Sequence, residues 1–464
     1  MNYAVAVAFL LIIGWSICFP LIRSHLSSVV LSPLGAGLVC ALGGTLAVAL
    51  RLGLGVAVVS TWVILCIAAW LLTRNSPSTL PLDRTLTVIT VVGLAPFLTL
   101  LGIAPIGWDA RSYWWLHAEW LLAGGEETAR LMGSDVFAGF HPDYPPLASA
   151  TVASVWALTS GTDEKTAQLV TTILSFSSIC AVVMFLFAVF PNSISKGARR
   201  TLALVVGAVG FLMSGPYATN GFVDTLWAAC FTGAAVLLLL SSKGGWQLRI
   251  GCLLVAVASL TKNEGLIASF LLLGVFAVAS RSASRTCLVA LSLIPGLIWQ
   301  ATARSLGAVS DLGVPRISGL LGADRDVLSR FSPTLTALSD YLAAPLAVML
   351  VLMITSYAFD RESFLKGRWM VVLTLGYALA LFFVYFLGNR EIHGHLASSV
   401  DRTTVSVRLM TTATMAYLLT GMWGRVMRRQ GEPVGQENER LRQSSPAVYS
   451  DLAGNSQRMR EPEE

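Results

Sequence analysis

Five short segments of the chain concentrate the ionisable and aromatic residues that could carry chemistry. They span residues 107–120, 140–147, 216–224, 261–265 and 389–402. The first begins Gly107-Trp108-Asp109, and its many Trp and Tyr residues suit a helix at the headgroup level of a membrane. Anchoring does not explain Asp109. An acidic side chain at the point where the chain leaves the membrane is partly desolvated, which costs free energy, and it contributes nothing to anchoring. We therefore predict a functional role for Asp109.

The second segment contains His141, Asp143 and Tyr144, followed directly by Pro145-Pro146. Two prolines impose an extended backbone and can start the next helix without losing an amide donor. Asp is also a favoured capping residue, so Asp143 has either a functional role or the role of capping that turn. The sequence does not decide between the two.

The third and fourth segments contribute Asp224 and the run Thr261-Lys262-Asn263-Glu264-Gly265. The apolar stretches around Lys262 have only about 13 and 16 residues, or about 20–24 Å as helices, so the charged turn should lie below the surface in a cavity. An ion pair between Lys262 and Glu264 is the structural alternative, although residues two apart do not face each other on a continuous helix. We predict an anion-binding or catalytic role, which is the usual one for ionisable groups at that depth.

The fifth segment carries Arg390, His393, His395 and Arg402. A solvated loop with Arg402 extending from a helix end is the alternative interpretation. The His-x-His pair with nearby acids could bind a divalent metal, but a third ligand at a diagnostic spacing is missing. We expect no metal site and no cofactor.

The elements that position these residues must be membrane helices. The 464-residue chain is 55% hydrophobic and 12% charged, with a mean hydropathy of +0.69, whereas soluble domains carry about 25% charged residues. Apolar runs of about 20 residues, enough to cross a hydrocarbon core, recur from Tyr3 to Trp423. These features exclude a water-soluble fold and predict an all-α, polytopic integral membrane protein with about 13 transmembrane helices.

The predicted spans fix the expected topology. They cover 3–22, 29–50, 53–72, 85–104, 166–190, 201–215, 221–240, 249–261, 265–280, 286–302, 336–357, 368–388 and 403–423. The short loops richest in Lys and Arg, such as 191–200 and 359–368, are expected in the cytoplasm. This orientation explains the net charge of +6 without a nucleic-acid partner. It requires 147–159, at about 20 Å, to be an interfacial or re-entrant helix that does not cross.

Three regions follow from this topology. We expect residues 1–84 to form N-terminal accessory helices and 85–423 to form a catalytic transmembrane module. Residues 424–464 lack apolar periodicity and are expected to be a disordered cytoplasmic tail. The outer loops of the module would be 105–165, 303–335 and 389–402. All five segments would then meet at the extracytoplasmic face of the cell membrane.

The order of these motifs resembles a known superfamily. A Trp-Asp element, a Tyr-Pro-Pro-Leu run, an Asp after a short span and Leu-Thr-Lys-Asn-Glu-Gly succeed one another over roughly residues 85–423. This order is similar to that of the GT-C polytopic glycosyltransferases, which include protein O-mannosyltransferases and the transferases that attach aminoarabinose to lipid A. The later His-Leu-Ala-Ser-Ser-Val-Asp-Arg stretch is similar to a segment of bacterial members.

The resemblance implies a polyprenyl-phosphate sugar donor at the outer leaflet and a hydroxyl acceptor on a lipid, glycan or protein. It implies Asp109 as the general base. The leaving lipid phosphate needs fixed cations, for which we assign Lys262 and Arg402, with Arg390 or Arg304 as substitutes. The residues expected to orient the substrate or those cations are Asp143, Tyr144, Asp224, Glu264, His141 and His395. Trp114 and Trp115 would stack on a sugar or line the lipid groove.

Other functions remain open at this point. A transporter or flippase for lipid-linked or anionic substrates would also bury ionisable residues, but such proteins usually show related halves and charges at the bilayer midplane. A glycan ligase or polymerase would use similar cations and a similar outer loop. A scaffold subunit would need no acid at the mouth of a cavity.

Overall fold

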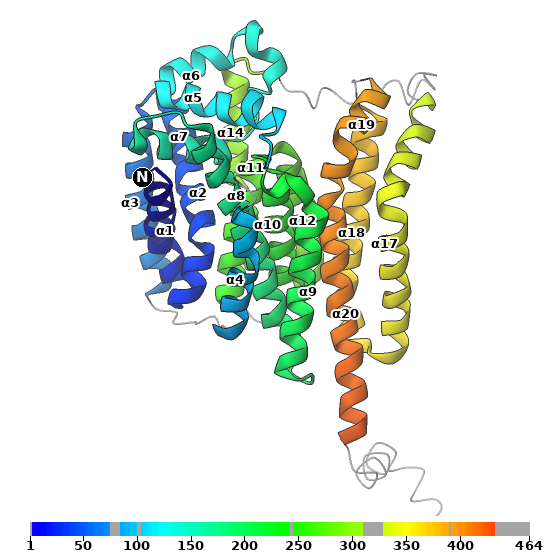
Figure 1. Cartoon of the computed structure of the whole chain (residues 1–464). Coiled ribbons are helices and arrows are strands. Elements are labelled where there is room, and N and C mark those ends of the chain that lie inside the picture. The colour runs from blue at the N-terminus through cyan, green and yellow to red at the C-terminus, as the bar shows by residue number, and fades with distance from the viewer. Residues whose placement is uncertain are drawn as a thin grey trace, which may run out of the picture.

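The chain folds as a bundle of helices (Figure 1). The computed structural model describes residues 2–74, 84–99, 104–241, 245–309, 328–388 and 391–431. Within these ranges every regular element is a helix, and eight helices are long and apolar enough to cross a membrane. The number rises to nine if two short helices joined by a 40° bend form one span. The all-helical class is therefore confirmed, whereas 13 crossings remain a prediction.

In the first half of the chain, long helices precede and follow a group of short helices that spans residues 110–159. Its α-helices are α1 (Asn2–Ile22), α2 (His25–Leu50), α3 (Leu54–Thr73), α4 (Arg84–Thr99), α5 (Leu116–Ala123), α6 (Gly125–Met132), α7 (Leu147–Thr159), α8 (Glu164–Val189) and α9 (Lys196–Ser214). Three short helices of other types are η2 (Ala110–Trp115), η3 (Asp135–Phe140) and η4 (Gly215–Ala218). Asp163 caps α8 by accepting from the backbone amides of Lys165 and Thr166.

The second half contains the remaining helices around the site. They are α10 (Asp224–Ala235), η5 (Val236–Leu240), α11 (Trp246–Thr261), α12 (Asn263–Ser280), α13 (Ala283–Leu291), α14 (Ile294–Ser305), α17 (Phe331–Phe359), α18 (Arg361–Phe386), α19 (Ile392–Thr403) and α20 (Val405–Gly431). The bend lies between α13 and α14. Helix α10 is buried throughout and packs against α8, α11 and α20, so the Asp224 at its start lies inside the bundle.

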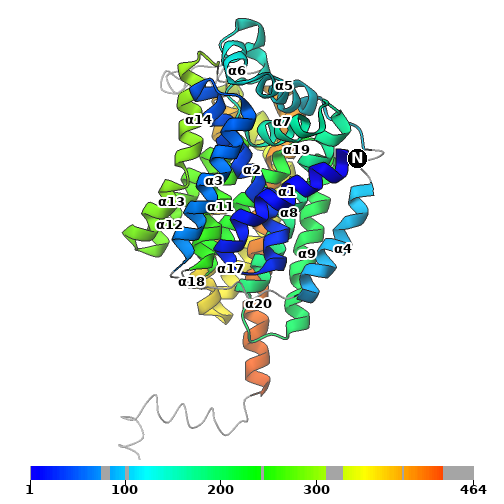
Figure 2. The same cartoon turned by 90° about the vertical axis from the view of Figure 1, so that its left-hand side faces the viewer.

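The two ends of the bundle carry different helices and different polar contacts (Figures 1 and 2). We call the end with α5, α6, α7 and α19 the upper end, and the end where α20 runs out the lower end. At the upper end Arg51 pairs with Glu126 at 3.6 Å. At the lower end Arg23 donates to the carbonyl of Thr73 at 3.0 Å. The described parts of the predicted functional segments lie at the upper end, away from the Lys- and Arg-rich stretch 191–200, which includes the start of α9.

Helix α7 lies at the upper end, beside α5 and α2. Its ten residues 147–156 are all buried, which explains why the sequence is apolar on every side of the helix. The hydroxyls of Thr151 and Ser154 donate to carbonyls four residues earlier, so they are satisfied without water. The segment 147–159 forms a single helix of 13 residues at one end of the bundle, and its interfacial or re-entrant position in a membrane remains a prediction.

Helix α2 connects the N-terminal region to the site. Within its most apolar window, 78% of the residues are buried, and it packs against α7 and α8 as well as α1 and α3. The region 1–84 therefore contributes part of the central packing, and α7 depends on α2 for one of its faces.

The turn between α11 and α12 depends on a close backbone approach. Lys262 is extended, with φ −157° and ψ 154°, and separates the two helices. A Cβ placed on Gly265, in the first turn of α12, would lie 2.1 Å from the carbonyl oxygen of Ala258 in α11. Only glycine permits this approach without a backbone shift.

We predict that Gly265→Ala lowers the free energy of unfolding by about 1–3 kcal/mol, because the added methyl must move α12 away from α11. Thermal unfolding of the purified protein in detergent measures the loss. Gly274→Ala is the matched control, since Gly274 is in the same helix with no atom within 4 Å of the added Cβ. Equal melting temperatures for the two variants would contradict the close approach.

Candidate functional site

Asp109 and Arg402, 293 residues apart in sequence, form an ion pair at the upper end. Asp109 directly precedes the π-helix η2, an irregularity that often marks functional sites. The backbone before it is fixed because the Gly107 amide donates to the Asn220 carbonyl at 2.8 Å. The side chains of Asp109 and Arg402 are 17% and 16% exposed, so the pair lies at the edge of the site.

Lys262 forms a second, deeper pair. Its Nζ lies 2.9 Å from Asp224 Oδ1 and 3.1 Å from Glu264 Oε1. The side chains of Lys262 and Asp224 are only 5% and 3% exposed. The Lys262–Glu264 ion pair, offered as the structural alternative, is therefore present, because the extended backbone at Lys262 means that the two residues do not lie on one continuous helix. Among the described residues, the buried Oε2 of Glu264 has no hydrogen-bond partner.

Asp143 ties the segment before α7 to the helices that follow Lys262. Its carboxylate Oδ2 accepts from the Asn263 amide at 2.7 Å. Its backbone carbonyl accepts from Trp299 Nε1 at 2.9 Å and from Gln300 Nε2 at 3.2 Å. Gln300 also donates to Asn263 Oδ1 at 2.7 Å, which closes the network. Pro146, rather than Asp143, occupies the N-cap of α7, so the capping interpretation is wrong.

Tyr144 joins the charged cluster to a layer of aromatic rings. Its ring stacks on His141 at a centroid distance of 4.4 Å and on Trp114 at 5.2 Å. Lys262 Nζ lies 6.0 Å from the same ring. Burial, followed by the carboxylates of Glu264 and Asp143, raises the pKa of Tyr144 well above its ordinary value. The phenol therefore stays neutral and can donate a hydrogen bond.

The residue before Arg402 faces a different set of partners. Asp401 Oδ1 accepts from Arg408 at 2.8 Å, and its Oδ2 accepts from the Tyr217 hydroxyl at 3.1 Å. Burial and the nearby Asp401 carboxylate raise the pKa of Tyr217 to about 12. The Arg402 guanidinium lies 5.2 Å from the Phe222 ring, which a cation can approach favourably. These contacts fix the junction between α19 and α20 against the turn before α10.

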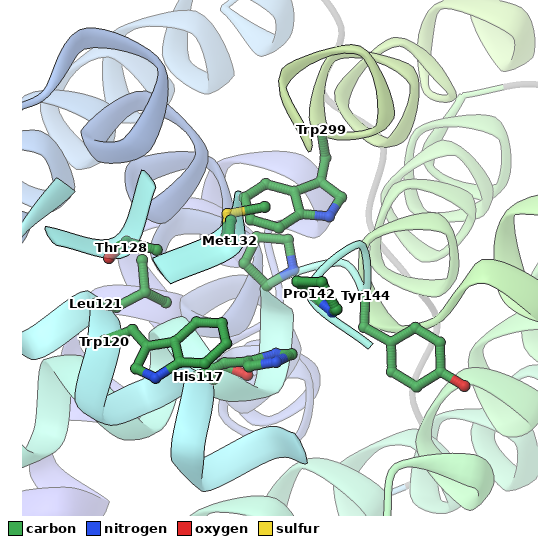
Figure 3. Close-up of a pocket in the computed structure, with 10 residues that line it drawn as sticks. His117, Trp120, Leu121, Thr128, Met132, Pro142, Tyr144 and Trp299 are labelled. Carbon is green, nitrogen blue, oxygen red and sulfur yellow. The ribbon is translucent and has the colours of Figure 1, made fainter. Parts of the chain in front are cut away.

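A small cavity borders Tyr144 (Figure 3). Trp120, Met132 and Trp299 contribute apolar walls, and the Tyr144 ring extends away from them at the cavity edge. Burial lowers the pKa of His117 to about 4. The neutral ring can donate from Nε2 to the Phe140 carbonyl, 3.0 Å away. The cavity is therefore an uncharged compartment next to the ionic cluster.

The cluster combines acids, cations and a neutral phenol in one partly enclosed place. Four carboxylates, those of Asp109, Asp143, Asp224 and Glu264, share it with the two cations of Lys262 and Arg402. Each cation is already paired with a carboxylate. The arrangement can accept a proton at its exposed edge, and it can bind an anion if that anion displaces a carboxylate.

The other residues predicted for the site differ in their burial and in whether the structure describes them. Arg390 lies outside the described residues. Arg304 is exposed near the end of α14. The His395 ring lies 4.9 Å from that of Tyr385, while Trp114 and Trp115 are both buried. No group of three or more His, Cys, Asp or Glu side chains in the described ranges is placed to hold a metal ion.

Sequence reasoning assigned no role of their own to several polar residues that position the site. Tyr217, Asn263 and Asp401 lie within the five segments singled out from the sequence, whereas Gln300 and Arg408 lie outside them. One signal was present, because Gln300 and Arg408 are polar residues inside predicted spans and such residues need a buried partner.

Comparisons with protein-family models, curated proteins and solved structures found no match to this chain.

We predict that Asp224→Asn lowers the free energy of unfolding by about 3–5 kcal/mol, because it leaves the buried Lys262 ammonium short of counter-charge. Replacing Lys262 by Met in the same chain should restore part of the loss. Glu362→Gln, which breaks the exposed Lys366 pair at 2.9 Å, is the control and should not change the melting temperature in detergent. Equal losses for Asp224→Asn and the double variant would contradict a charge effect.

Proposed function

We propose that the chain is a membrane glycosyltransferase that moves a sugar from a polyprenyl-phosphate donor to a hydroxyl acceptor. The observation that carries the proposal is the clustering of Asp109, Arg402 and Lys262. One carboxylate suited to take a proton lies at the edge of the site beside an arginine, and a buried lysine lies deeper. The GT-C resemblance of the sequence suggests the reaction class. The cluster offers a proton acceptor for the attacking hydroxyl and cations for the leaving phosphate.

Asp109 acts as the general base in this proposal. It removes the proton from the acceptor hydroxyl as the oxygen attacks the anomeric carbon of the sugar. The bond between that carbon and the donor phosphate oxygen breaks, and the electron pair leaves with the phosphate. The proton ends on Asp109 and the sugar on the acceptor, so atoms and charges balance. A carboxylate that is 17% exposed can reach an incoming hydroxyl and is still partly shielded from water.

Arg402 and Lys262 stabilise the charge that grows on the leaving phosphate. Arg402 offers the planar donor pattern that matches phosphate oxygens, and Lys262 offers a compact charge. Asp224 holds Lys262 in place from inside the bundle. Arg390 is a further candidate for the phosphate.

The sugar hydroxyls require acceptors and a flat apolar surface. Glu264 fits the first need because its Oε2 is buried without a partner among the described residues. Tyr144 fits the second need because its ring, which stacks on the buried Trp114, is partly exposed and can offer an aromatic surface to a sugar. Asp143, His141 and His395 support these groups through the contacts described above. No step requires a cofactor.

The proposed topology has 13 crossings, with the upper end outside the cell. Its support is the distribution of charge, since the lower end carries Lys196, Arg199 and Arg200 at the start of α9 and Arg361, Lys366 and Arg368 at the start of α18. Cytoplasmic loops carry such an excess of Lys and Arg. The C-terminus would then be cytoplasmic, and the site would face the outer leaflet.

We predict that Asp109→Asn reduces sugar transfer by at least about 100-fold, because general-base catalysis contributes roughly that much. The measurement uses purified full-length protein with a labelled polyprenyl-phosphate sugar and a hydroxyl acceptor. Glu164→Gln is the control, since it removes an acid that pairs with Arg111 at the same end of the protein. Transfer by Asp109→Asn at the wild-type rate would contradict the assignment.

Topology mapping gives a second test of the proposal. Reporters fused after Asp109, Lys196, Lys262 and Arg402 should place only the Lys196 fusion in the cytoplasm, because Lys196 alone of the four lies at the lower end. Paired reporters that are active on opposite sides of the membrane read each position twice. A cytoplasmic signal at Asp109 would mean that α7 crosses or that the orientation is inverted.

A further inference from the structure

The two ion pairs of the site differ in how easily they can open. Lys262 and Asp224 are almost fully buried, at 5% and 3% exposed, and Lys262 has Glu264 as a second partner. Arg402 and Asp109 are 16% and 17% exposed, and they pair through one contact, from Nη1 to Oδ2. Separating the buried pair would leave charges without water, whereas Arg402 and Asp109 can be partly hydrated. The Arg402–Asp109 pair is therefore the one that an incoming ligand can open.

The backbone around Arg402 is fixed, whereas its side chain has a donor nitrogen that can still bind an acceptor. Asp401, the preceding residue, is tied to Arg408 and Tyr217. The Arg402 Nε is buried and has no partner among the described residues. The guanidinium rests near the Phe222 ring, over which it can pivot without losing that contact. An arginine so placed can exchange one oxygen acceptor for another.

The ion pair also engages Asp109. Arg402 donates to Asp109 Oδ2, so one of the two carboxylate oxygens is taken while the pair is closed. A phosphate group offers an arginine two oxygens in a matching plane, so it can compete for the guanidinium. A neutral acceptor alcohol cannot compete in this way.

We propose that Arg402 is a shared cation, bound to Asp109 in the free protein and transferred to the phosphate of the lipid-linked ligand when that ligand binds. Transfer frees both oxygens of Asp109 for the acceptor hydroxyl, so we expect the anionic ligand to bind before that hydroxyl is deprotonated. This inference rests on the proposed function and adds an order of binding to it. It also explains how a site whose cations are already paired can receive an anion.

The test measures binding of farnesyl phosphate, a short polyprenyl phosphate, to the purified full-length protein. Asp109→Asn should bind it about tenfold more tightly than wild type, because a competing charged hydrogen bond is removed. Arg402→Gln should bind it more weakly. In the double variant, Asp109→Asn should give no gain over Arg402→Gln alone, since the gain acts through Arg402.

Controls separate this effect from general electrostatics and from lipid binding. Glu164→Gln removes one negative charge at the same end and should leave the affinity for farnesyl phosphate unchanged. Farnesol lacks the phosphate and should bind equally to wild type and Asp109→Asn. Inorganic phosphate tests the headgroup alone, and a gain for Asp109→Asn with this probe would show that the prenyl chain is not needed for the exchange.

The outcomes distinguish the exchange from the proposed function. Unchanged or weaker binding of farnesyl phosphate by Asp109→Asn, together with loss of sugar transfer, would overturn the exchange and leave the catalytic assignment intact. An equal gain for Asp109→Asn in the presence and absence of Arg402 would also overturn the exchange. Failure of every variant to bind farnesyl phosphate would contradict the proposed donor class itself.

Discussion

The arrangement of the upper end depends on the buried pair between Lys262 and Asp224. A charge inside a helical bundle is costly unless it is paired and hydrogen-bonded, so Asp224 must start α10 where Lys262 ends α11. That requirement fixes the turn between α11 and α12. The turn in turn places Asn263 against Asp143 and Glu264 beside the ammonium. The edge of the site, where Asp109 meets Arg402, is built on this interior.

Much of the fold could be predicted from apolar runs, because the length of such a run and the lack of charge within it are read directly from sequence. The run from Tyr3, for example, corresponds to α1, and the run 166–190 corresponds to α8. Breaks within apolar stretches were harder to place. The bend between α13 and α14 falls inside the predicted span 286–302 and directly precedes Pro295 in the first turn of α14.

The candidate site was predictable in its members but not in its pairings. Asp109, Lys262 and Arg402 were visible because charged residues stand out beside apolar spans. The pairing of Lys262 with Glu264 could be named only as an alternative, since the extended backbone at Lys262 that permits it is not evident from the sequence. The roles of Gln300 and Trp299 depend on α14 lying beside the segment before α7, a contact between residues about 156 positions apart. Such long-range contacts leave no local pattern.

The contacts of the adjacent residues Asp401 and Arg402 require that α19 keep its rotation about its own axis. Neighbouring positions on an α-helix point about 100° apart, and here each direction serves a different partner, Arg408 and Tyr217 for one and Asp109 for the other. Inserting or deleting a single residue in α19 would turn both side chains away from their partners at once. Length variation among natural relatives should therefore be confined to the stretch before α19 and be absent within it.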